Sequence, residues 1–320
     1  MNSASARDRL VQAMPPVFVL IWSTGFIVAR YGMPHAPPIS FLSMRYALSV
    51  LCFGAWIAIS RAAWPSGRAQ WLHLAVSGVL MHAGYLGGVW AAVKSGMGAG
   101  TIALLVGLQP VLTAVWMSVT AGASATEGEA RVSSRQWLGL VLGLSGLLLV
   151  VWRKLGAGEL TAWNLSLAAF ALLCITAGTL YQKRFVAPCD VRTANTVQLL
   201  AALAVSLPVA LWEALVEHEA IVFHPHLIGA MAWSVIGLTL GGSSLLYLLI
   251  QRGAATRVTS LLYLVPPTTA LMAWLLFGES ITPTMVLGMA LTAVGVALVV
   301  RSPAPAAAAA PATAVSPRPE

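Results

Sequence analysis

The sequence has few charged residues. Asp, Glu, Lys and Arg make up 9% of its 320 residues, whereas a soluble domain carries about 25%. Hydrophobic residues make up 58%, and the mean hydropathy is +0.83. So few charges cannot cover the surface of a water-soluble protein of this size, and so much apolar content excludes a disordered one. The composition therefore predicts an integral membrane protein with the lipid bilayer around it.

Cysteine is also scarce. Cys52, Cys174 and Cys189 lie far apart, so the chain has no disulfide framework and no CxxC metal motif. The HExxH, P-loop and GxSxG motifs are missing, and no GxGxxG follows a strand pattern. The sequence thus predicts no catalytic residue, no cofactor and no structural metal site.

One segment does collect residues that can bind metals: Glu217, His218, Glu219, His224 and His226. Imidazole and carboxylate groups can coordinate a divalent ion. Their spacing matches no compact helical or finger motif, however. This favours a solvated loop over a metal site.

Carboxylates are missing from the middle of every apolar segment. The acidic residues nearest to these segments stand at their ends or in loops: Glu129, Glu159, Glu213 and Glu279. A membrane carboxylate is the common proton relay of coupled carriers. The sequence therefore argues against that relay and against a strongly cationic substrate, and favours a neutral, zwitterionic or anionic one.

Ten apolar segments are present. About 20 helical residues cross a bilayer, and lipid offers no partner to unpaired backbone groups. We therefore predict an all-α integral membrane fold of ten transmembrane helices. The expected spans are residues 14–30, 38–60, 71–93, 99–121, 137–152, 163–184, 194–215, 227–250, 257–277 and 284–300. The segments 137–152 and 284–300 are short, which places them at the edge of the bundle.

The net charge of +8 indicates orientation rather than nucleic-acid binding. If the N-terminus is cytoplasmic, thirteen Lys and Arg residues fall on the inner side and four, namely Arg30, Lys94, Arg153 and Lys154, on the outer side. Lys and Arg collect on the cytoplasmic side of membranes. Both termini are therefore expected in the cytoplasm, with a small-molecule substrate as partner. The sequence leaves self-association into a homo-oligomer open.

The two halves of the chain repeat each other. Residues 137–151 match 286–300 at seven of fifteen positions, and a Gly-Glu pair precedes each at 128–129 and 278–279. We assign one five-helix repeat to 14–152 and a second to 163–301, with a disordered Pro/Ala-rich tail at 302–320. Because five is odd, the second repeat enters the membrane inverted. Inverted repeats are typical of secondary transporters, whose binding site lies at the midplane between the halves.

Several local features resemble one family. They are Trp22-Ser23-Thr24-Gly25-Phe26 in the first span, Arg45 in the second, Tyr85 and Trp90 in the third, a proline in the fourth and ninth, and the Gly-Glu pairs. With the five-plus-five pattern they resemble the EamA-type members of the drug/metabolite transporter superfamily. The resemblance implies an inner-membrane carrier, often an exporter of amino acids or other small metabolites. The longer polar loop at residues 121–135 departs from the pattern of the second repeat.

Two ionisable side chains are the first candidates for substrate binding. Arg45 is the one charge inside a span. It can pair with a substrate carboxylate, or extend to the membrane interface. His82, midway along the third span, can titrate near neutral pH, or stay neutral and bond to a neighbouring helix. Its counterpart under the repeat offset is Thr239.

Further candidates line faces of the same spans. Tyr85, Leu86 and Val89 share the helical face of His82. Gln109-Pro110 and Pro266-Pro267 predict kinks that expose backbone groups. The remaining substrate-binding candidates are Trp22, Trp90, Gln109, Trp116, Ser243, Tyr247 and Tyr263.

These observations lead to a secondary transporter that works by alternating access. A membrane-embedded lipid-modifying enzyme is the alternative, and a purely structural subunit is a third. The inverted repeat favours the transporter, because it has no evident use in an enzyme or a scaffold.

Overall fold

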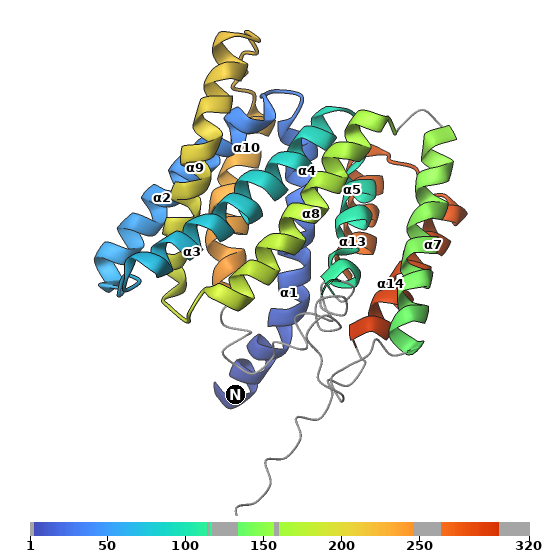
Figure 1. The fold of residues 1–320 in the computed structure, drawn as a ribbon, viewed down its shortest axis with the longest axis horizontal. Coiled ribbons are helices and arrows are strands. Elements are labelled where there is room, and N and C mark those ends of the chain that lie inside the picture. The colour runs from blue at the N-terminus through green and yellow to red at the C-terminus, as the bar shows by residue number, and fades with distance from the viewer. Residues whose placement is uncertain (1–2, 114–115, 117–133, 157–159, 246–263, 301–320) are drawn as a thin grey trace, which may run out of the picture.

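The structure is a computed structural model that describes residues 3–113, 116, 134–156, 160–245 and 264–300, all of them helical or in connections between helices (Figure 1). The helices are α1 (Ser3–Gly32), α2 (Pro38–Ser60), α3 (Arg68–Gly78), η1 (Val79–Gly84), α4 (Tyr85–Lys94), α5 (Ala99–Val106), α7 (Ser134–Gly156), α8 (Ala162–Phe185), α9 (Val191–Leu215), α10 (Pro225–Ala232), η2 (Trp233–Gly242), α13 (Val265–Phe277) and α14 (Pro283–Val300). The tail at 302–320 and the loop at 117–133 lie outside these residues, and so does Glu129.

Seven stretches in the described ranges are long and apolar enough to cross a membrane. They overlap predicted spans one, two, three, five, six, seven and eight, most of them extending a few residues beyond the predicted bounds. The shorter apolar helices Ala99–Thr113, Val265–Phe277 and Pro283–Leu298 overlap the other three. The described chain is thus all-helical, with several potential membrane spans, while the count of ten stays a prediction.

Helices at equivalent places in the two halves pack side by side and run antiparallel. The second span, α2, begins beside the last turn of α9, where the Glu213 carboxylate accepts a hydrogen bond from the Ser40 N–H (2.7 Å). The fourth span, α5, begins beside the end of α13, where Glu279 accepts from the Ala99 N–H (2.9 Å). Opposite directions for equivalent helices are what an inverted repeat requires.

The glycines of the sequence repeat form the crossing of α7 and α14. These two helices stand together at the right edge of the bundle in Figure 1. A Cβ added at Gly146 lies 2.5 Å from the Gly288 carbonyl oxygen, and one added at Gly288 lies 2.6 Å from the Gly146 oxygen. Only glycine allows the two backbones to approach so closely. As predicted from their short apolar segments, this pair lies at the edge.

Spans three and eight each contain a π-helical segment, in which the backbone widens beyond the α-helical turn. The two segments, η1 and η2, are equivalent under the repeat offset, which pairs His82 with Thr239. Such segments occur often at functional sites. They place these two residues in the interior of the molecule.

Candidate functional site

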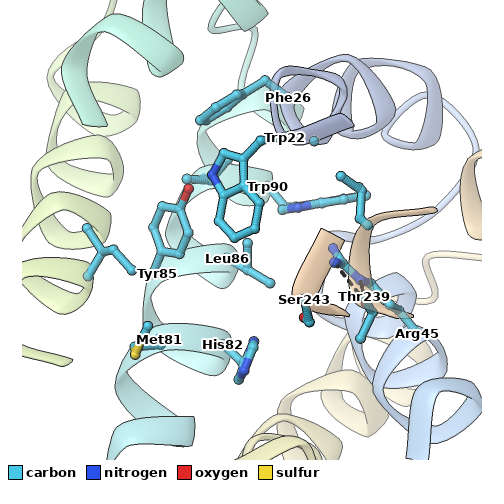
Figure 2. A pocket seen from close by; sticks show the side chains of 14 residues that line it. Trp22, Phe26, Arg45, Met81, His82, Tyr85, Leu86, Trp90, Thr239 and Ser243 are labelled. Atoms are coloured by element: carbon cyan, nitrogen blue, oxygen red, sulfur yellow. Dashed lines mark hydrogen bonds between the residues drawn. The ribbon is translucent and has the colours of Figure 1, made fainter. Parts of the chain in front are cut away.

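A cavity of about 140 Å³ lies between the two halves of the bundle. Its walls come from α1, α2, η1 with α4, α8, and η2 with the residue that follows it. The lining residues are Trp22, Gly25, Phe26, Arg45, Met81, His82, Tyr85, Leu86, Val89, Trp90, Ile175, Leu238, Thr239 and Ser243, and Figure 2 shows them around it. A cavity of roughly 150 Å³ accepts a molecule the size of benzene, so this one suits a small metabolite.

Arg45 provides the charge in this cavity. Its side chain is buried at 8% exposure, so it does not extend to the membrane interface. Its Nε and Nη2 donate to the Thr239 hydroxyl at 3.3 and 3.1 Å (Figure 2). Thr239 donates its own proton to the Ser234 carbonyl (2.8 Å), which turns its oxygen lone pairs toward the guanidinium.

Arg45 has more N–H donors than its hydrogen bonds to Thr239 use. A guanidinium carries five N–H groups, and two of them reach Thr239. Among the described residues, no carboxylate forms an ion pair with Arg45. A buried cation without a counter-charge is costly in a membrane interior. Arg45 thus keeps N–H donors in the cavity that Thr239 does not use.

His82 lines the cavity together with Arg45, and its backbone is bonded to α2. Its carbonyl accepts a hydrogen bond from the Tyr46 hydroxyl (2.8 Å), and Gln198 of α9 lies near its ring. Gln198 donates to Ser77 (3.0 Å) and to Gln182 (3.3 Å). A polar network of Ser77, Gln182 and Gln198 therefore lies next to His82.

Aromatic rings form the other walls. Trp22 and Phe26 lie one turn apart on α1, and Tyr85 and Trp90 lie on α4. Trp90 is 1% exposed and stacks on Phe41 with ring centroids 4.4 Å apart. These flat, rigid surfaces can hold an apolar or aromatic part of a ligand.

The structure brings six of the ten predicted site residues to the cavity: Trp22, Arg45, His82, Tyr85, Trp90 and Ser243. Gln109 instead donates to Thr179 of α8 (2.9 Å). Trp116 is 61% exposed and does not line the cavity. Tyr247 and Tyr263 lie outside the described residues.

The predicted kinks also lie away from the cavity. The helix of span four is interrupted at Gly107 and Leu108, just before Pro110. Pro266 stands in the first turn of α13, and a Cβ added at Gly107 would lie 2.9 Å from its Cγ. The two proline regions therefore contact each other.

Residues that were not among the predicted substrate-binding candidates complete the walls. Phe26 follows Trp22 by one helical turn, so helical spacing contains the signal for it. Met81, Ile175 and Leu238 are apolar residues in apolar spans. Nothing in their type or spacing distinguishes a cavity wall from ordinary packing.

Two carboxylates cap helices at one end of the bundle. We call this the His35 end: it comprises the α1–α2 turn (33–37) and the α9–α10 connection (216–224), at the top of Figure 1. Glu213, 7% exposed, accepts from the Ile39 N–H (3.1 Å) and from the Ser40 hydroxyl (2.8 Å) as well as its N–H. Glu279 caps α5 in the same way. Glu213 and Glu279, both in the second half, thus each cap a helix of the first half.

Comparison with known proteins gives a consistent result. The model of the EamA-like transporter family matches residues 17–152 and 162–301. The probable amino-acid metabolite efflux pump of Salmonella typhimurium is 24% identical over 87% of this chain and 90% of its own. The uncharacterized inner membrane transporter YedA of Escherichia coli K12 is 23% identical over 88% of this chain and 87% of its own.

A solved structure, titled only as the crystal structure of a protein, has the same fold. It superposes with a TM-score of 0.59 at 16% identity and covers 90% of this chain and 96% of that one. Two family matches along the sequence, the apolar helices and the transporter-named relatives together indicate a transporter rather than an enzyme. The chain belongs to the EamA-like transporter family and is a multi-pass membrane transporter.

Proposed function

We propose that this transporter exports a small amino-acid-like metabolite that carries a carboxylate. Arg45 is the observation that carries the proposal, since it is buried in the cavity with N–H donors that no described protein group accepts. A substrate carboxylate supplies the missing counter-charge in bidentate geometry. The aromatic walls then hold the rest of the molecule.

The relatives support the direction and the substrate class. Two curated relatives, from Salmonella typhimurium and from Escherichia coli K12, are named as probable amino-acid metabolite efflux pumps. A zwitterionic amino acid or a close derivative matches both that description and the cavity, which holds one cation and has a volume of about 140 Å³. A strongly cationic substrate is disfavoured by Arg45 itself.

The proposed mechanism is alternating access by ten helices in two inverted repeats. The antiparallel packing of α2 with α9 and of α5 with α13 supports the inversion. Arg45 belongs to the first half and Thr239 to the second. A substrate carboxylate that accepts the Arg45 N–H groups in place of Thr239 would loosen the Arg45–Thr239 bond between the halves. Substrate binding would in this way be coupled to their movement.

We further propose that the protein lies in the inner membrane with both termini in the cytoplasm. The excess of Lys and Arg on one side supports this orientation. The His35 end then faces outward. Fluorescent-protein and phosphatase fusions at the C-terminus test it: fluorescence without phosphatase activity is expected, and the reverse contradicts it.

Efflux from proteoliposomes tests the function. Vesicles containing the purified protein are preloaded with labelled neutral amino acids, and saturable efflux is expected. Arg45→Gln should lower the rate at least about tenfold, because a hydrogen bond to a charged group contributes about 1.5–3 kcal/mol. Arg153→Gln, the same exchange at an exposed residue of α7, should leave it unchanged. Wild-type efflux by a folded Arg45→Gln protein contradicts the assignment.

A further inference from the structure

Three histidines meet at the His35 end. His35 lies in the α1–α2 turn, His224 is the N-cap of α10, and His226 is in its first turn. One ring nitrogen from each lies within 4.8 Å of the others. The His35 and His224 rings stack with centroids 4.3 Å apart, and the His226 ring centroid lies 4.6 Å from that of His224. Sequence spacing alone did not reveal this cluster, because His35 is distant from the others along the chain.

The fold holds the cluster together from both sides. The Val222 N–H donates to the His35 carbonyl (2.8 Å), which fixes the α9–α10 connection against the α1–α2 turn. His226 packs edge-on against Tyr31 of α1 with ring centroids 5.4 Å apart. His35 and His224 are half-buried, whereas His226 is exposed. The site is thus built by backbone and ring contacts and remains open to ions.

We propose that His35, His224 and His226 bind a divalent transition-metal ion of the Zn²⁺ type. Imidazole nitrogen is a preferred ligand of Zn²⁺, Cu²⁺ and Ni²⁺. Three protein ligands with one position left to water is a common zinc arrangement. Zinc–nitrogen bonds of about 2.0–2.1 Å place tetrahedral nitrogens about 3.3 Å apart. The ring nitrogens, now within 4.8 Å of one another, must therefore come closer when an ion binds.

Binding requires a defined rearrangement. His224 Nδ1 now accepts a hydrogen bond from the His226 N–H (3.2 Å). Coordination through either nitrogen of His224 ends this bond, because the metal takes one lone pair and the ring proton occupies the other nitrogen. Partial burial and the neighbouring His224 and His226 lower the pKa of His35, which favours the neutral form that ligates metals.

A metal here would join the two halves of the molecule. His35 belongs to the first half, and His224 and His226 belong to the second. They lie at the same end as the Glu213 and Glu279 caps and the Lys94–Glu219 ion pair (3.2 Å). If the chain alternates between open states as proposed above, an ion that bridges this end holds it closed. Transport is then inhibited by metal added on this side.

Direct metal binding tests the site independently of transport. The full-length protein, purified in detergent with its histidine tag removed, is titrated with Zn²⁺ against a chromogenic chelator. One ion per chain is expected. His35→Ala, His224→Ala and His226→Gln should each weaken binding about 100-fold or more, since even outer-shell changes cost 10–100-fold. His226→Gln alters an exposed side chain, so its fold should be retained.

The matched control is His218→Asn. His218 lies in the same connection but outside the trio, and Asn tolerates its positive φ of 53°. Its Zn²⁺ affinity should equal that of the wild type. With Co²⁺ as probe, the spectrum should lack a thiolate charge-transfer band, which excludes the three cysteines as ligands. The site is overturned if each of the three variants still binds one Zn²⁺ per chain as the wild type does. It is also overturned if the wild-type protein does not bind one Zn²⁺ per chain.

Inhibition is read separately in the efflux assay. Zn²⁺ should slow wild-type and His218→Asn transport but not that of His226→Gln. If Zn²⁺ binds to the wild-type protein without slowing efflux, the metal site stands and the proposed inhibition of transport is wrong. If the wild-type protein binds Zn²⁺ but transports no amino acid, the metal site stands and the proposed function is wrong.

Discussion

Arg45 is the residue on which the proposed binding site depends. The sequence identified it as a charge within a span, and its burial at 8% exposure excludes extension to the interface. Its contact with Thr239 joins α2 to η2 across the two halves. A neutral hydroxyl offsets only part of the cost of the buried charge. This incompletely balanced charge is the observation on which the proposed anionic substrate group depends.

Glu213 shows a structural use of a buried carboxylate. Replacing Glu213 by Ala leaves the N–H groups of Ile39 and Ser40 without their acceptor, so we expect a loss of about 2 kcal/mol of stability. Thermal unfolding in detergent measures it. Glu217→Ala, an exposed neighbour in the α9–α10 connection, is the control and should unfold as the wild type does. Equal melting of the two variants contradicts the cap.

Part of the site was predictable at this level, for physical reasons. The spacing of His82, Tyr85, Leu86 and Val89 predicted one helical face, and all four line the cavity. Gln109 has polar groups suited to a binding site, but it donates to Thr179 of α8 and does not line the cavity. The sequence alone could not show that partner, because it lies on another helix. A sequence shows which side chains can bond; which of them satisfy each other within the protein depends on packing.

Among the elements, the π-helical segments were the least predictable. Sequence periodicity assumes 3.6 residues per turn, and a wider turn changes the register without changing composition. Gly84, Gly241 and Gly242 stand in or beside these segments, yet glycines in membrane helices more often serve packing. The predicted starts and ends of α2, α8 and α9 agree with the structure within a few residues, because long apolar runs and turn residues mark them.

The crossing of α7 and α14 gives a prediction for a pair of elements. Gly146→Ala places a methyl group against the Gly288 backbone, so the helices must separate. Overpacking of this kind costs about 1–3 kcal/mol, and we expect a lower melting temperature and lower yield. Gly54→Ala on α2 is the control, since a Cβ there meets nothing within 4 Å. Equal stability of the two variants would show that the crossing is loose.

For the whole molecule, the sequence repeat predicted more than a helix count. Matching glycines in spans five and ten turned out to be the contact between those spans, and the Glu of the second Gly-Glu pair caps α5. The repeat could not show that the carboxylates, the Lys94–Glu219 pair and the histidines gather at one end. That arrangement depends on how the connections fold back over the bundle, and the loops have no periodic pattern from which to predict it.

If the halves rock, the His35 end must open during each cycle, and locking it should stop transport. Lys94→Cys and Glu219→Cys place thiols on opposite halves, in a chain whose native cysteines are replaced by Ser. A short, reducible cross-linker between them should abolish efflux, and reduction should restore it. Each single-cysteine variant, treated alike, should keep its activity. Full efflux by the cross-linked protein would mean that this end does not move, and alternating access between these halves would then be wrong.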